Sequence, residues 1–170
     1  MPPKRVCLRD VKRKRWLDPR PAGMGTDDAP AWCLRDVSPQ VGDSELSLYV
    51  FPEDRSDELA PMVGAAIVAG GNELDHAEFL LFDESILTSV GLTATPSLGE
   101  TPHEDVNRLH VSVSISAKRA AALAGAVYGR ADIKRLLDKE VKALLIAARQ
   151  KGKLNSALIR PKVQKALDAV

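Results

Sequence analysis

Aromatic residues are scarce in this sequence, which has two Trp, two Tyr and three Phe among its 170 residues. A core must therefore be built mainly from Ala, Val, Leu and Ile. The same scarcity argues against a protein that binds single-stranded nucleic acid by stacking bases on several rings.

Cysteine is equally rare, because only Cys7 and Cys33 are present. They form no CxxC pair, and one bridge alone would not make a disulfide framework. We therefore expect both residues to be reduced thiols in a protein of the cytoplasm.

Long apolar runs are absent too. The longest apolar stretches, around residues 62–69 and 120–127, fall well short of the ~20 residues that span a bilayer. The opening MPPKRVCLRD is basic but lacks the apolar segment of a secretory signal peptide. We expect a soluble, cytoplasmic protein with no membrane partner, and the abundance of Ala, Arg, Asp and Val favours a bacterial source.

The common catalytic and cofactor-binding motifs are missing as well. The chain has no GxGxxG, no P-loop and no GxSxG elbow. The string HEDVNRLH at 103–110 is not HExxH, and residues seven apart lie about 10 Å apart along a helix, too far to share one zinc ion easily. His76, beside Asp75 and Glu78, is more typical of a surface imidazole than of a general base. We predict no catalytic residue, no metal site and no cofactor, and expect a protein that is not an enzyme.

The N-terminal part of the chain is predicted to be rich in strands. Two similar segments, VCLRDV at 6–11 and WCLRDV at 32–37, each have the length of a short strand. A turn at 38–43 would make 32–37 and 45–51 a β-hairpin. A helix is expected over 57–69, followed by a strand at 77–82, a long loop at 91–105 and a strand at 110–116, whose alternating Val and Ser residues mark one buried face.

The C-terminal part is predicted to be helical. Ser116 suits the N-cap of an Ala-rich helix that ends at Gly129. A second helix is expected over 131–151 on the basis of its apolar spacing, and a final one begins at Pro161. The predicted fold is therefore a single α+β domain, 1–170, with a small mixed or antiparallel sheet in its N-terminal two-thirds and a three-helix C-terminal segment packed on it.

Charge is strongly segregated along the chain, although the formal net charge is only +1. Residues 1–17 carry a net charge of +6, residues 18–116 carry −14 and residues 117–170 carry +9. We interpret these as a basic N-terminal strand or arm, an acidic β-rich part and a basic helical part.

Two basic clusters are the best candidates for a binding site. On the predicted helix 131–151, four residues at spacings of four, three and seven would form a stripe opposite the apolar face. A second cluster precedes Trp16, which offers a ring for stacking. The candidate binding residues are Arg135, Lys139, Lys142 and Arg149 in the first cluster, and Lys12, Arg13, Lys14 and Arg15 in the second.

Three functional hypotheses follow. The first is a non-enzymatic intracellular accessory or regulatory protein that engages a charged protein partner through its basic C-terminal helices, or associates with itself through its oppositely charged regions. The second is a nucleic-acid-binding protein that uses the same basic residues on phosphates. The third is a small enzyme of unrecognised class with a site near His76, Asp83 and the 91–105 loop.

Overall fold

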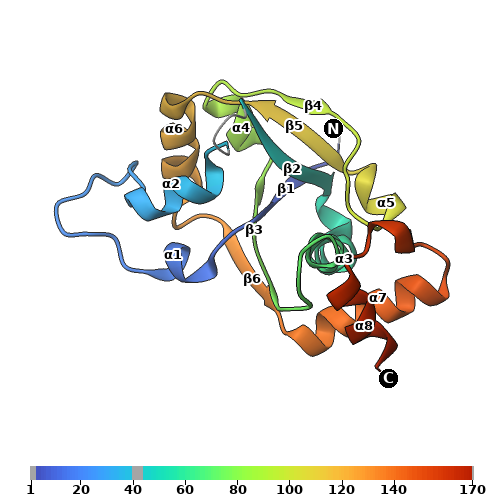
Figure 1. Cartoon of the computed structure of the whole chain (residues 1–170). Coiled ribbons are helices and arrows are strands. Elements are labelled where there is room, and N and C mark those ends of the chain that lie inside the picture. Colours follow the sequence, from blue (N-terminus) through green and yellow to red (C-terminus); the bar gives the residue numbers. More distant parts are fainter. Residues whose placement is uncertain (1–2, 40–43, 170) are drawn as a thin grey trace.

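The computed structural model describes residues 3–39 and 44–169, and its centre is a six-stranded antiparallel sheet (Figure 1). The strand order is β4-β5-β2-β1-β3-β6. Strand β1, near the N-terminus, is central and pairs with both β2 and β3. The strands are β1 (Arg5–Asp10), β2 (Glu45–Pro52), β3 (Ala77–Asp83), β4 (Ala94–Pro96), β5 (His110–Ser114) and β6 (Asp132–Leu136).

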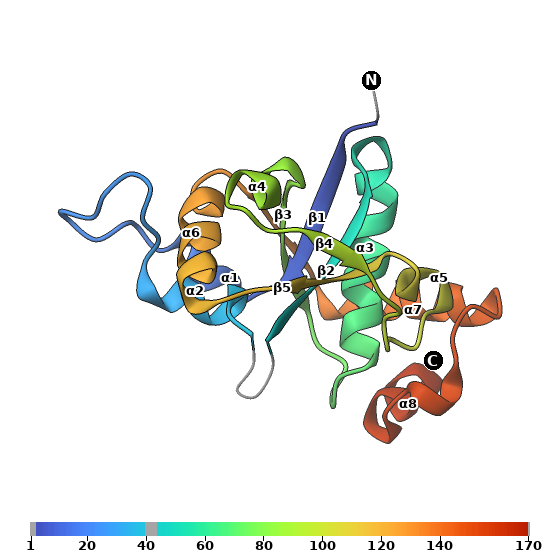
Figure 2. The ribbon, with the colours of Figure 1, turned by 90° about the horizontal axis from the view of Figure 1, so that it is seen from above.

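Helices cover both faces of the sheet, as the view from above shows (Figure 2). One face is covered by α1 (Arg13–Leu17), α2 (Ala31–Val37), α4 (Ser85–Ser89) and α6 (Ala117–Val127). The other is covered by α3 (Ser56–Ala69), α5 (Glu104–Asn107), α7 (Asp138–Gln150) and α8 (Pro161–Asp168). Two short 3₁₀ helices, Glu53–Arg55 and Ser156–Leu158, complete the described elements.

Two hydrophobic cores result, one on each side of the sheet. In β1, Cys7 belongs to the core beneath α2 and α6, whereas Val6 and Leu8 belong to the core beneath α3 and α7. Alternate residues of a strand point to opposite faces, so this central strand is buried on both sides. That explains why its apolar residues are consecutive.

The α+β prediction is confirmed, and several elements lie where they were expected. The predicted strands 6–11, 45–51, 77–82 and 110–116 correspond to β1, β2, β3 and β5. The Ser116 side chain caps α6 by accepting a hydrogen bond from the backbone N–H of Arg119 at 3.3 Å. Pro161 is the first residue of α8, as predicted. Gly129 and Gly152 follow α6 and α7 with positive φ angles, a conformation that glycine adopts without strain.

The predicted strand at 32–37 is wrong, because these residues form α2. The pentapeptide CLRDV therefore occurs once as a strand and once as a helix. Behind Pro30, the spacing of Cys33, Asp36 and Val37 places all three buried residues on one side of a helix. The predicted hairpin is wrong too, since β2 pairs with β1 and β5. Residues 40–43 of its predicted turn lie outside the described residues.

The single helix predicted over 131–151 is also wrong. Residues 132–136 form β6, which pairs with β3 at the edge of the sheet, and α7 begins only at Asp138. Ile133 packs in one core and Leu136 in the other. Residues three apart share a face of a helix but lie on opposite faces of a strand, so the apolar spacing fitted both structures. The sheet consequently extends beyond the N-terminal two-thirds of the chain.

The loop predicted at 91–105 holds more structure than expected, since it contains β4 and the first residues of α5. Within residues 3–39 and 44–169, no helix combines the length and the apolar composition needed to cross a membrane.

Candidate functional site

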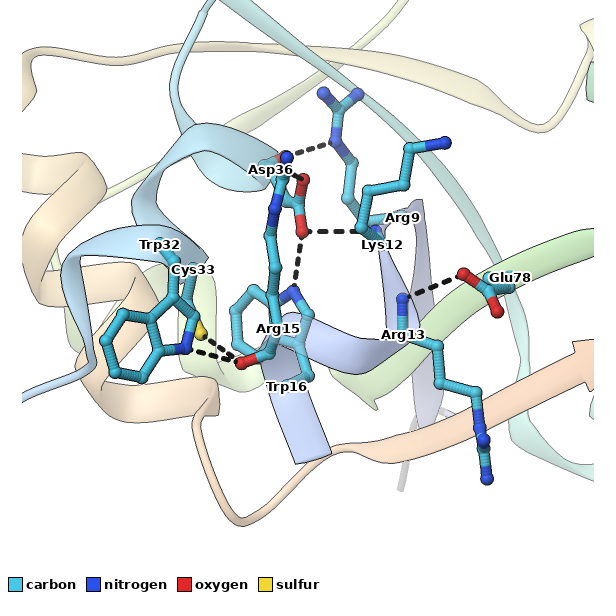
Figure 3. A network of polar contacts seen from close by, with 9 residues as sticks. All are labelled: Arg9, Lys12, Arg13, Arg15, Trp16, Trp32, Cys33, Asp36 and Glu78. Atoms are coloured by element: carbon cyan, nitrogen blue, oxygen red, sulfur yellow. Dashed lines mark hydrogen bonds and ion pairs between the residues drawn. The ribbon is translucent and has the colours of Figure 1, made fainter. Parts of the chain in front are cut away.

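The carboxylate of Asp36 attaches the basic segment of α1 to α2 (Figure 3). Asp36 is 8% exposed and accepts three hydrogen bonds. Arg15 Nη1 donates to Oδ1 at 2.5 Å, while Trp16 Nε1 and the backbone N–H of Lys12 donate to Oδ2 at 2.9 and 3.2 Å. Three of the residues in Lys12–Trp16 are thus held by one buried charge.

Backbone carbonyls strengthen the same attachment. The carbonyl of Arg15 accepts hydrogen bonds from Trp32 Nε1 at 2.9 Å and from Cys33 Sγ at 3.1 Å. Burial raises the pKa of the Cys33 thiol to about 12, which keeps it protonated and able to donate. Arg9 Nε donates to the carbonyl of Asp36 at 2.7 Å, linking α2 to β1. The α1 segment is therefore attached to α2, and α2 is attached in turn to β1.

Trp16 does not provide a stacking surface, contrary to the sequence prediction. It is 4% exposed, and its ring lies 6.2 Å from that of Tyr128, measured between centroids. The indole fills the core beneath α1 because the helical turn directs it inward while the neighbouring Lys14 and Leu17 face solvent.

Glu78 of β3 brings the two basic clusters together. Its Oε2 accepts a hydrogen bond from the backbone N–H of Arg13 at 3.0 Å. Its Oε1 lies 3.8 Å from Arg135 Nε and 3.6 Å from His76 Nε2. Arg135 is opposite Glu78 in the β3–β6 register, so both side chains lie on the face that α1 covers.

We define the α1–β6 surface as Lys12, Arg13 and Lys14 of the α1 segment and Arg135 of β6, together with Lys139, which follows the end of β6 in the sequence. Within residues 3–39 and 44–169, neither Lys12, Lys14 nor Lys139 has a carboxylate partner within 4 Å, and all three are exposed. Exposed cations without a carboxylate in direct contact attract an acidic partner.

Exposed apolar side chains accompany these cations. Leu17 ends α1 and is 51% exposed, Trp32 is 38% exposed, and Leu137, directly after β6, is 43% exposed. Trp and Arg are enriched at protein–protein interfaces. Apolar side chains next to cations favour a protein partner, because a phosphate backbone has no apolar side chains to pack against them.

Comparison with known proteins adds no family to this geometry. No family model, no curated protein and no solved structure matches the chain.

The other two candidate residues of the predicted stripe lie elsewhere. Lys142 Nζ donates to the carbonyl of Ala169 at 3.0 Å. Arg149 donates to the Asp168 carboxylate at 2.6 Å and to the carbonyl of Leu167 at 3.1 Å. Both cations therefore neutralise the negative end of α8. The predicted continuous stripe is wrong, because Arg135 lies on a strand and these two side chains serve an internal contact.

The residues considered for an enzymatic site are assembled only in part. Asp83 lines a cavity of about 610 Å³ together with Leu92, Thr93 and Ala94 of the 91–105 loop, whereas His76 is not among its lining residues. His76 precedes β3 and Asp83 ends it, which separates them by roughly 20 Å of extended chain. Among the described residues, no group of three or more His, Cys, Asp or Glu side chains is arranged to hold a metal ion.

Asp36 and Glu78 were not identified from the sequence. A helical signal for Asp36 did exist, because Cys33, Asp36 and Val37 follow Pro30 at the spacing of residues that share one side of a helix. Glu78 was considered only as a neighbour of His76, and no local signal points to its contacts with Arg13 and Arg135, which are 65 and 57 residues away in the sequence.

Proposed function

We propose that this protein is a non-enzymatic binding module that recognises an acidic, partly apolar segment of a partner protein through the α1–β6 surface. The observation that carries the proposal is the contact of one carboxylate, Glu78, with the backbone N–H of Arg13 and with the guanidinium of Arg135. This contact joins two basic clusters that are separated by more than a hundred residues. Lys12, Lys14 and Lys139 remain without a carboxylate partner within 4 Å among the described residues.

A protein segment fits this surface better than nucleic acid does. Trp16 is buried and cannot stack on a base. The exposed Leu17 and Leu137 match apolar residues in a peptide.

Fluorescence anisotropy tests the proposal with three labelled probes: a peptide of alternating Glu and Leu, a polyglutamate peptide of equal length, and duplex DNA. We expect the Glu/Leu peptide to bind most tightly, because it satisfies both the cations and the apolar side chains. Reversing the charge of Lys12, Lys14 and Lys139 to Glu is expected to weaken its binding about tenfold or more.

The matched control reverses three exposed basic residues on other elements, Lys118→Glu, Arg160→Glu and Lys165→Glu, which change the net charge equally. It should bind the peptide within about twofold of the wild type. An equal loss in both variants would mean that only net charge matters, and the proposal would be wrong. DNA binding that is tighter than peptide binding and falls steeply with salt would instead support the nucleic-acid hypothesis.

A further inference from the structure

A cavity of about 590 Å³ lies on the face of the sheet opposite α1, between α3, α5 and α7. Its walls are mainly apolar and include Leu59 and Met62 of α3, Leu109 after α5, and Leu144 and Ala147 of α7. Pockets for small molecules have this size and this predominance of apolar lining. The cavity is separate from the α1–β6 surface and is independent of the proposed function.

Of the three basic residues that line the cavity, two have carboxylate partners among the described residues and one does not. Arg55 donates to both carboxylate oxygens of Glu58, at 2.8 and 3.2 Å. Lys153 lies 3.0 Å from the Asp105 carboxylate, and this hydrogen bond holds the pKa of Asp105 below its ordinary value. Lys151 is exposed, and no carboxylate of the described residues lies within 4 Å of it. The cavity therefore offers one uncompensated positive charge beside an apolar interior.

His103 adds a polar group to the cavity wall that lacks a partner. Its side chain is buried, the residue being only 3% exposed, and its Nδ1 has no hydrogen-bond partner among the described residues. The backbone is held in place by a β-bridge to Leu154. Burial lowers the pKa of the imidazole, which favours the neutral form, able to donate one hydrogen bond and to accept another. Buried polar atoms are nearly always hydrogen-bonded, so the covered and unpartnered Nδ1 of this lining residue is a candidate for a polar atom of a ligand, once a small movement of the cavity wall uncovers it.

We propose that this cavity binds a small amphipathic carboxylate, with its apolar body between α3 and α7 and its carboxylate at Lys151 and His103. The apolar walls disfavour sugars and other polar molecules. One free cation suits a singly charged carboxylate better than a nucleotide, whose several phosphate charges would need several cations.

Calorimetric titration with 2-naphthoate tests this directly, and 2-naphthalenemethanol serves as the neutral ligand of nearly the same shape. We expect naphthoate to bind at least tenfold more tightly than the alcohol. Lys151→Ala should weaken naphthoate about tenfold while leaving the alcohol unchanged. Ala147→Phe, which places a ring at the cavity, should abolish the binding of both ligands.

Lys165→Ala on α8 is the matched control and should leave both affinities unchanged, and circular dichroism should show that every variant is folded. The proposal is wrong if naphthoate does not bind, if the two ligands bind equally well, or if Ala147→Phe leaves binding intact. A loss of affinity in the Lys165 variant equal to that of the Lys151 variant would also contradict it, since the charge would then not act locally.

Discussion

Asp36 supports α1 more than any other described side chain, because it accepts hydrogen bonds from three residues of the Lys12–Trp16 segment. Asp36→Ala leaves the Trp16 indole N–H without its acceptor in the core and the Arg15 guanidinium without its carboxylate. We expect the free energy of unfolding to fall by about 3 kcal/mol. Guanidinium denaturation measures this value.

Asp54→Ala is the appropriate control for Asp36→Ala, since Asp54 is exposed. Its unfolding free energy should stay within about 0.5 kcal/mol of the wild type. A loss of less than 1 kcal/mol in the Asp36 variant, no larger than a typical neutral hydrogen bond contributes, would show that the carboxylate does not hold α1 in place.

The two cysteines are expected to be unreactive in the folded protein. Both are free and buried, and burial raises the pKa of each thiol, that of Cys33 to about 12. Because the thiolate is the reactive form, an aromatic disulfide reagent at pH 8 should release almost no colour from the native protein. In denaturant it should titrate both thiols. Rapid reaction of either thiol in the native state would contradict the buried positions of Cys7 and Cys33.

At the scale of elements, α8 depends on cations of α7. Arg149 and Lys142 bind the last carbonyls and the Asp168 carboxylate at the end of α8. Arg149→Ala removes a favourable charge at a helix C-terminus and is expected to cost about 1 kcal/mol. The loss acts mainly on α8, so we expect residues 161–169 to exchange their amide hydrogens faster in this variant than in the wild type.

Hydrogen exchange followed by mass spectrometry measures this loosening, with Lys165→Ala as the control on the same helix. Unchanged exchange of residues 161–169 in the Arg149 variant would show that the contact is incidental. Charge reversal at Arg149 is accordingly a poor test of partner binding, since it also disturbs α8.

The sequence was sufficient for elements whose pattern fits one structure only. The alternation of Val and Ser identified β5, and Pro161 identified the start of α8. It was insufficient where a pattern fits two structures, as in CLRDV and in residues 132–136, because the choice depends on pairing with distant strands. Of the eight candidate binding residues, five form the α1–β6 surface, Arg15 binds Asp36, and Lys142 and Arg149 bind α8. No local pattern could separate these groups, since Asp36, Glu78 and Asp168 reach them only after folding.

At the scale of the whole molecule, the segregated charges meet within one chain. Among the described residues, eight ion pairs join the basic ends, 1–17 and 117–170, to the acidic middle part, 18–116. They include Lys4 with Glu53 and Lys162 with Glu73. Mostly exposed pairs of this kind each contribute little, so we attribute to them mainly the arrangement of the chain ends.

Acid is expected to destabilise the fold in a defined window. Hydrogen bonds from Lys153 to Asp105 and from Gln164 to Asp168 hold the pKa values of these carboxyls below their ordinary values. The folded state therefore prefers the ionised form, and this stabilisation is complete above about pH 4 and is lost as the pH falls through the lowered pKa values.

His103 and His110 act in the same direction at higher pH. Burial lowers both imidazole pKa values, so the fold favours the neutral form. Stability is then complete above about pH 6.5 and decreases as the pH falls below it. Urea denaturation midpoints should decrease from pH 7 to pH 5 and again from pH 4 to pH 3. A midpoint that rises on acidification would contradict these shifts.

The role of the α1–β6 surface in partner recognition is tested most directly by mapping the binding of the acidic Glu/Leu peptide on the protein by amide chemical shifts. We predict that the largest changes fall in α1, residues 12–17, and in β6 and the start of α7, residues 132–139. Largest changes in α8 or around the 590 Å³ cavity would contradict the assignment of the α1–β6 surface as the site of partner recognition.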